Sequence, residues 1–167
     1  MQRDDLLKFL TDITADRIAI LQRHEAAARV VSNYDFNNTY QYVIGREETQ
    51  LQWLQTALGE FGVGLPQPAT TYPAPEAPKA KKPEPSAFRG ILEEDARGLK
   101  SFVDRWRPRI EGVTHARHRT MLGVILGESL EHARMFEQAA GGFEDVLGRR
   151  TSQAARVGAV LPTRWLE

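Results

Sequence analysis

Cysteine is absent from the 167-residue sequence. Its absence excludes disulfide bridges, thiolate zinc sites, cysteine-ligated iron–sulfur clusters and cysteine nucleophiles, and with them a rubredoxin-type module. The sequence also lacks any run near the ~20 apolar residues that a membrane-spanning helix needs. Its first ten residues, MQRDDLLKFL, carry acids and no apolar signal core, so we expect a cytoplasmic protein with no membrane partner.

An excess of charge of either sign is missing as well. Lys and Arg together number 22, as do Asp and Glu, so the formal net charge is zero and nucleic acid is not an expected partner. No segment is typical of a strand, and neither a phosphate-binding glycine loop nor a nucleophile elbow is present. The 41% apolar and 26% charged residues are ordinary for a soluble globular protein, and the length favours one domain over residues 1–167.

Proline is scarce outside a single segment. Seven of the nine prolines lie in residues 62–86, which therefore cannot be helical and should be extended. This segment separates a first helix pair, residues 3–61, from a second pair, residues 87–140. A tail of residues 141–167 follows, and its Trp165 and Leu166 are candidates to dock on the helices.

Apolar residues recur at helical spacing on both sides of the proline-rich segment. The pattern predicts four helices, over about residues 3–32, 36–61, 87–106 and 114–140. Asp35 and Ser86 are the expected N-caps of the second and third helices. On the fourth helix the residues expected to face inward are Met121, Val124, Ile125, Glu128, either Glu131 or His132, and Met135. The sequence therefore predicts an all-α four-helix bundle.

The length of the proline-rich segment bears on topology. Antiparallel neighbours need only ~2–8 connecting residues, whereas this segment has about 25. At ~3.1 Å per extended residue it exceeds the ~37 Å length of a bundle helix. It can therefore cross the whole bundle and start the third helix at the end where the second began. The alternative is a flexible tether without a topological role.

The two helix pairs resemble each other. A shift of 79 positions aligns Phe9, Ile13, Asp16 and Ile20 with Phe88, Leu92, Asp95 and Leu99. A shift of 81 aligns Tyr40, Val43, Glu47, Gln50 and Leu54 with Met121, Val124, Glu128, Glu131 and Met135. Heptad spacing alone explains matching apolar positions, so the informative feature is an acid in the same place of each aligned stripe.

Each of the four helices thus carries one acid on its apolar stripe, namely Asp16, Glu47, Asp95 and Glu128. A buried carboxylate must be paired, protonated or bound to a metal, because its isolated charge is costly. We expect the four carboxyl groups to cluster near the bundle centre, where a dication would hold them together. The alternative is that each acid pairs with a basic neighbour, for which the candidates are Arg17, His24, Arg46, Arg97 and Arg105.

With these acids the sequence resembles the ferritin-like superfamily of di-iron and di-manganese carboxylate proteins. The family pattern is a single acid from each of two helices and Glu-x-x-His from each of the other two. Asp16 and Asp95 match the single acids, with Asp in place of Glu. In REETQLQWL, residues 46–54, Glu47 matches the motif and Gln50 stands where His is expected. In GESLEHARMF, residues 127–136, Glu131 lies three positions after Glu128, and His132 lies one position late.

The resemblance implies one or two Fe or Mn ions held by these carboxylates, together with Gln50, Glu131 and His132. It implies oxidoreductase or metal-storage chemistry, with no catalytic residue assigned. Without both motif histidines, selection for iron over other dications is weakened. The alternative is a degenerate, non-catalytic ferritin-like bundle without metal, which acts through its surface or by self-association as a homo-oligomer.

Overall fold

The computed structural model describes residues 2–149, which form four α-helices and one short 3₁₀ helix and contain no strand. The helices are α1 (Arg3–Val30), α2 (Tyr34–Gly59), η1 (Pro85–Phe88), α3 (Arg89–Glu111) and α4 (Ala116–Ala140). The predicted all-α class is confirmed. Trp165 and Leu166, the expected docking residues of the tail, lie outside the described residues.

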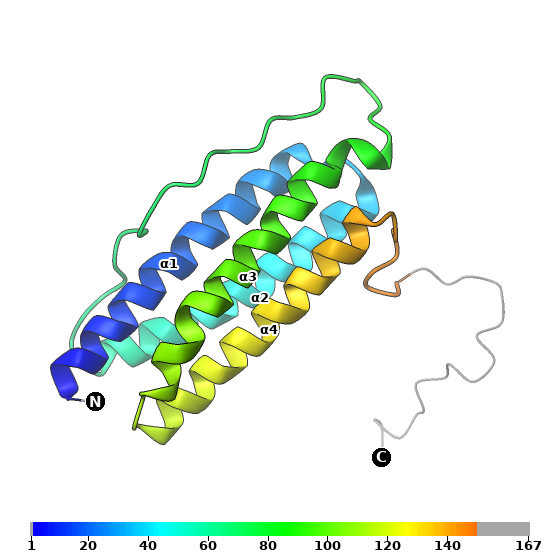
Figure 1. The fold of residues 1–167 in the computed structure, drawn as a ribbon. Coiled ribbons are helices and arrows are strands. Elements are labelled where there is room, and N and C mark those ends of the chain that lie inside the picture. Colours follow the sequence, from blue (N-terminus) through cyan, green and yellow to red (C-terminus); the bar gives the residue numbers. More distant parts are fainter. Residues whose placement is uncertain (1, 150–167) are drawn as a thin grey trace, which may run out of the picture.

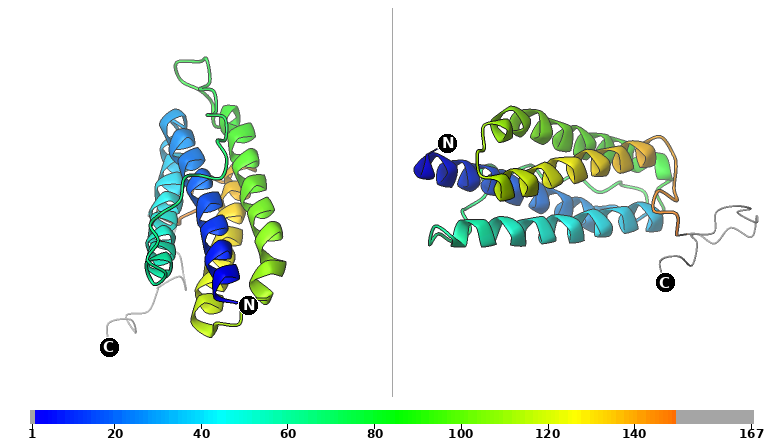
Figure 2. Two further views of the ribbon diagram at one scale, coloured as in Figure 1. Left: turned by 90° about the vertical axis from the view of Figure 1, so that its left-hand side faces the viewer. Right: turned by 90° about the horizontal axis from the view of Figure 1, so that it is seen from below.

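The helices pack as two adjoining pairs. α1 packs along α2 and α3 packs along α4, while α1 also meets α3 and α2 meets α4. Residues 60–84 connect the pairs along the outside of the bundle. They run from the end where α2 stops to the opposite end, where α3 starts (Figures 1 and 2).

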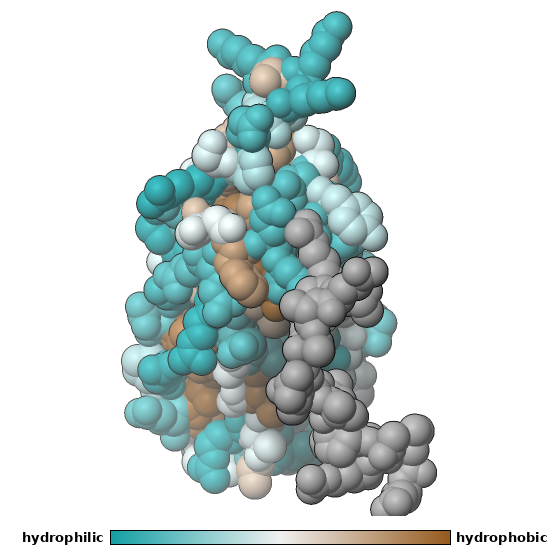
Figure 3. All heavy atoms as spheres, turned by 90° about the vertical axis from the view of Figure 1, so that its right-hand side faces the viewer, coloured by the Kyte–Doolittle hydropathy of each residue, from teal (hydrophilic) through white to brown (hydrophobic). Residues whose placement is uncertain are grey.

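Two backbone groups of this connecting segment form hydrogen bonds with α1. The Ala69 N–H donates to the Ala15 carbonyl over 2.9 Å, and the Arg23 side chain donates to the Pro73 carbonyl over 2.5 Å. Tyr72, between these points, is half-buried against the core. The part of the segment that rises above the bundle is mainly hydrophilic (teal, top of Figure 3). The segment is thus held against the bundle near its middle and solvated at its tip.

Aromatic side chains from all four helices occupy the core. Phe9 of α1 meets Trp106 of α3 edge-on at a centroid distance of 5.6 Å, and Tyr40 of α2 lies 4.6 Å from Phe136 of α4. Burying each such ring stabilises the fold by roughly 1.5–3 kcal/mol. Within residues 2–149 no helix combines the length and the apolar character needed to cross a membrane.

Three of the expected helix boundaries are wrong. Asn33, rather than Asp35, caps α2, because its side chain accepts from the Phe36 N–H at 3.0 Å. Ser86 lies inside η1, and the residue at the N-cap of α3 is Phe88, which has no side-chain cap hydrogen bond. α3 also continues past Trp106 to Glu111 with Pro108 inside it. A proline in the last turn removes one N–H donor, and the buried Ile110 beyond it keeps that turn against the core.

The expected inward face of α4 is partly wrong: Ile125 and His132 are buried as expected, but the centre of the buried face is shifted by one residue. Val124 is 44% exposed, whereas Leu122, Ile125 and Leu126 are buried. One residue corresponds to a rotation of about 100° around the helix axis. The physical reason is that this orientation buries two leucines and Phe136, and leaves the side-chain-free Gly123 and Gly127 facing solvent.

Candidate functional site

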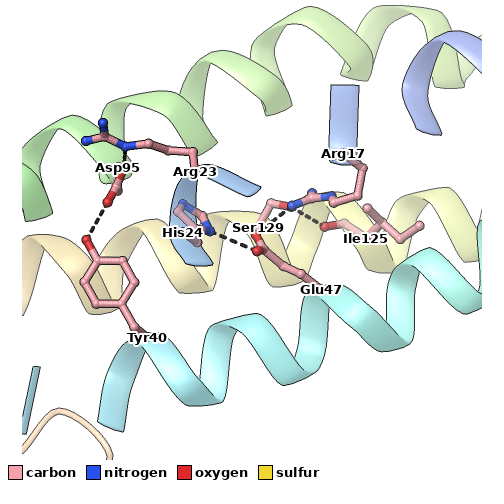
Figure 4. A network of polar contacts seen from close by, with 8 residues as sticks. All are labelled: Arg17, Arg23, His24, Tyr40, Glu47, Asp95, Ile125 and Ser129. Atoms are coloured by element: carbon pink, nitrogen blue, oxygen red, sulfur yellow. Dashed lines mark hydrogen bonds and ion pairs between the residues drawn. The ribbon is translucent and has the colours of Figure 1, made fainter. Parts of the chain in front are cut away.

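The centre of the bundle holds an arginine. Arg17 of α1 is fully buried, and its Nη1 donates to Glu47 Oε1 of α2 over 2.9 Å. Its Nη2 donates to Ser129 Oγ of α4 over 2.5 Å, and that hydroxyl donates to the Ile125 carbonyl (Figure 4). The Cζ atom of the guanidinium lies over the Phe102 ring of α3, 4.1 Å from its centroid. Arg17 therefore touches all three other helices.

His24 completes the environment of Glu47. Its Nδ1 lies 2.9 Å from Glu47 Oε2, so both carboxylate oxygens have a partner. Burial disfavours the imidazolium, but the charge and hydrogen bond of Glu47 outweigh it and raise the pKa of His24. Burial also disfavours the Glu47 carboxylate, and His24 and Arg17 outweigh that effect, so the pKa of Glu47 is lowered. The three groups form one buried charged unit.

Asp16 and Asp95 form reciprocal bridges between α1 and α3. Asp16 of α1 accepts from Arg105 and from the Trp106 indole of α3, each at 2.7 Å through Oδ2. In the opposite sense, Asp95 of α3 accepts from Arg23 Nε of α1 at 2.8 Å. Asp95 Oδ2 also accepts from the Tyr40 hydroxyl of α2. The two aspartates therefore join the two helix pairs.

Glu128 makes the corresponding bridge between α4 and α2. Its Oε1 accepts from Arg46 and its Oε2 accepts from Gln50 Nε2 at 2.6 Å. Burial opposes ionisation, but Gln50 and Arg46 prevail and lower the pKa of Glu128. The Glu128 side chain retains 26% of its surface exposed, so this bridge lies nearer the surface than the others.

His132 and Glu131, which the sequence left as alternatives, have opposite environments. His132 is buried with its ring edge-on to Tyr42, and its Nδ1 has no hydrogen-bond partner among residues 2–149. Burial lowers the pKa of His132 to about 4, so its ring is neutral at neutral pH. The Glu131 side chain is 58% exposed and pairs with Arg134 on the same helix, so it does not reach the core.

The expected single cluster of carboxylates does not form. Among residues 2–149, no three His, Asp or Glu side chains come together in a group able to hold a metal ion. Nearly every oxygen of the four stripe acids is engaged by a donor, and only Asp16 Oδ1 has none. As they stand, these residues do not fit a di-metal centre.

Partners for the four acids were predicted largely correctly. Arg17, His24, Arg46 and Arg105 all pair with stripe acids, and Arg97 does not. Sequence reasoning missed four participants: Arg23, Tyr40, Trp106 and Ser129. Arg23 had a visible signal, because it lies seven positions after Asp16 on the same helical stripe. Ser129 faces the core only in the observed rotation of α4, so the expected rotation did not place it near the acids.

The corrected rotation also changes the internal alignment. The buried residues of α4 lie 82 positions after those of α2, as Leu122 does after Tyr40. On this alignment Ser129 corresponds to Glu47, and His132 corresponds to Gln50. Arg17 thus binds two side chains at equivalent positions of the two pairs, one charged and one neutral.

Comparison with protein-family models, with curated proteins and with solved structures finds no match to this chain.

Proposed function

We propose that this chain is a ferritin-like four-helix bundle in which the Arg17 network replaces a di-metal centre, and that it serves a non-catalytic, structural or interaction role. The arrangement of the helices supports the first part. α1 packs along α2 and α3 along α4, and the long proline-rich segment joins the pairs end to opposite end. This is the topology of a bundle made of two similar hairpins with one long crossover.

The position of Arg17 carries the proposal. Its guanidinium binds Glu47 and Ser129, the equivalent inward positions of α2 and α4. A dication bound between those helices would face a fixed positive charge at close range, and the two would repel each other strongly in a medium of low dielectric constant. Arg17 also pairs with Glu47, so the charge of this buried carboxylate is neutralised without a metal ion.

Metal analysis of the purified full-length chain tests this proposal. The protein is incubated with Fe(II) under anaerobic conditions or with Mn(II), passed through a desalting column and analysed by mass spectrometry. We expect no stoichiometric metal and no saturable rise in melting temperature. One or two retained equivalents, lost in Glu47→Gln and kept in the surface control Glu131→Gln, would overturn the proposal.

One observation favours the second function, a metal-dependent oxidoreductase or metal-storage protein using Fe or Mn. The buried Gln50 Oε1 and His132 Nδ1 have no partner among residues 2–149, and both groups belong to the predicted ligand set. Nitrogen and oxygen donors of this kind suit Fe and Mn. The same experiment decides, since this function requires retained metal that His132→Gln reduces and Glu131→Gln does not.

A further inference from the structure

A cavity of about 330 Å³ lies between α1 and α3 and shares His24 with the Arg17 network. Ile20, Arg23 and His24 line it from α1, and Tyr72 of the connecting segment contributes to its wall. The α3 side is formed by Glu94, Asp95, Arg97, Gly98 and Ser101. The volume is within the ~300–1,000 Å³ of small-molecule sites, near the lower end.

Gly98 lines this space from α3. It is half-buried in the middle of α3, and a Cβ placed there would meet no other atom within 4 Å. Glycine in a helix interior is unfavourable compared with nearly any other residue. The helix thus carries a destabilising residue where a side chain would occupy the cavity.

Acids as well as hydrogen-bond donors line this cavity. Arg23 is already bound to Asp95 and Glu94, so these three charges satisfy one another. Arg97 lines the cavity and forms no ion pair or hydrogen bond with any residue from 2 to 149. It supplies a guanidinium, which suits planar carboxylates.

His24 and Ser101 add to this donor character. His24 Nδ1 is paired with Glu47, so the other ring nitrogen, Nε2, is left for the cavity and donates there when the ring is protonated. The Ser101 hydroxyl also lines the cavity and has no partner among residues 2–149. The side chain of Ile20 and the Tyr72 ring supply apolar surface beside these donors.

We propose that this cavity binds a small organic acid, with its carboxylate on Arg97 and its apolar body between Ile20 and Tyr72. The connecting segment then forms one wall of a binding site as well as joining the helix pairs. Its contacts at Ala69 and Pro73, on either side of Tyr72, hold that ring in place. The site is independent of metal and separate from the function proposed above.

Benzoate is a suitable probe, with benzamide as its uncharged analogue and inorganic phosphate as an anion without an apolar body. Titrations of the full-length chain are followed by calorimetry and by the Gly98 and Ser101 amide signals in NMR spectra. We expect saturable benzoate binding with shifts at both amides, and binding of benzamide and phosphate at least about tenfold weaker. Equal binding of phosphate and benzoate, or no saturation by benzoate, would overturn the proposal.

Two pairs of variants locate the site. Gly98→Leu should abolish benzoate binding by filling the cavity, while Gly127→Leu, an exposed glycine of α4, should leave it unchanged. Arg97→Gln should weaken binding about tenfold, and Arg107→Gln, an exposed arginine of the same helix, should not. If Gly98→Leu does not fold, the arginine pair still decides. Binding that is insensitive to Arg97→Gln would refute the assignment.

Discussion

Arg17 and Glu47 form an ion pair of 2.9 Å in which neither side chain has any exposed surface. Such a pair is costly to desolvate and costly to break, so its two members depend on each other. With His24 and Ser129 around it, the pair fixes how α1, α2 and α4 meet. The consequences of removing one member or both are therefore different.

Arg17→Met should destabilise the fold by roughly 3–5 kcal/mol, because Glu47 stays buried with only His24 beside it. The double variant Arg17→Met/Glu47→Gln should recover a substantial part of that loss, since no unpaired charge remains. Urea unfolding at neutral pH measures both, with the exposed Arg107→Met as control. A single variant as stable as the control would show that Arg17 does not support the core.

The pH dependence of stability should report His132. Its folded-state pKa of about 4 lies below the ordinary 6.5, so the unfolded chain takes up the proton first as the pH falls. The contribution of neutral His132 is complete above pH 6.5 and is lost progressively toward pH 4. At pH 4.5 the loss should be about 2–3 kcal/mol.

His132→Gln isolates this effect, because glutamine does not titrate and all other groups are shared with the parent chain. Free energies of unfolding are compared at pH 7.5 and pH 4.5. We expect the parent to lose about 2–3 kcal/mol more than the variant between these values. A parallel pH response in both proteins would mean that His132 titrates normally.

Tyr40→Phe removes the hydroxyl that donates to Asp95 and keeps the ring in the core. One oxygen of a buried carboxylate then loses its donor, which should cost about 1–3 kcal/mol in chemical denaturation. Tyr42→Phe is the matched control, because Tyr42 is 38% exposed and its ring contact with His132 survives the change. Equal effects of the two substitutions would contradict the role of the Tyr40–Asp95 bond.

Asn33→Ala should destabilise the chain by about 1 kcal/mol, because the first turn of α2 loses its cap. Asn38→Ala, inside the same helix, serves as control and should be neutral or slightly stabilising, since alanine is the better helix former. Thermal unfolding of both variants provides the comparison. A larger loss in Asn38→Ala would place the start of α2 elsewhere.

The all-helical class was predictable from the sequence because it depends on strong, repeated signals. The apolar stripes of α1 and α2 and the proline-rich break each extend over many residues, so an error at one position changes little. The boundaries and the rotation of α4 depend on single residues. One apolar stripe of α4 contains Met121, Val124 and Met135, and a second contains Leu122, Leu126 and Phe136. Only packing against the other helices decides which of the two is buried.

The acids of the candidate site and most of their basic partners were predictable, but which partner binds which acid was not. An acid on an apolar stripe signals a buried charge whatever neutralises it. Whether a metal or an arginine does so depends on which long side chain from another helix reaches it, and sequence spacing does not contain that information. Arg23 shows this, because it crosses from α1 to Asp95 on α3.

The bridges between the helix pairs have a consequence for fragments of this chain. Several ion pairs join the first helix pair to the second, and those that involve the stripe acids are Arg23–Asp95, Arg46–Glu128 and Arg105–Asp16. The α1–α2 hairpin supplies two of the cations and the α3–α4 hairpin supplies the matching anions. Two copies of one hairpin would leave those charges without counterparts, so separately expressed halves should complement each other as a heterodimer and should not substitute for each other as homodimers.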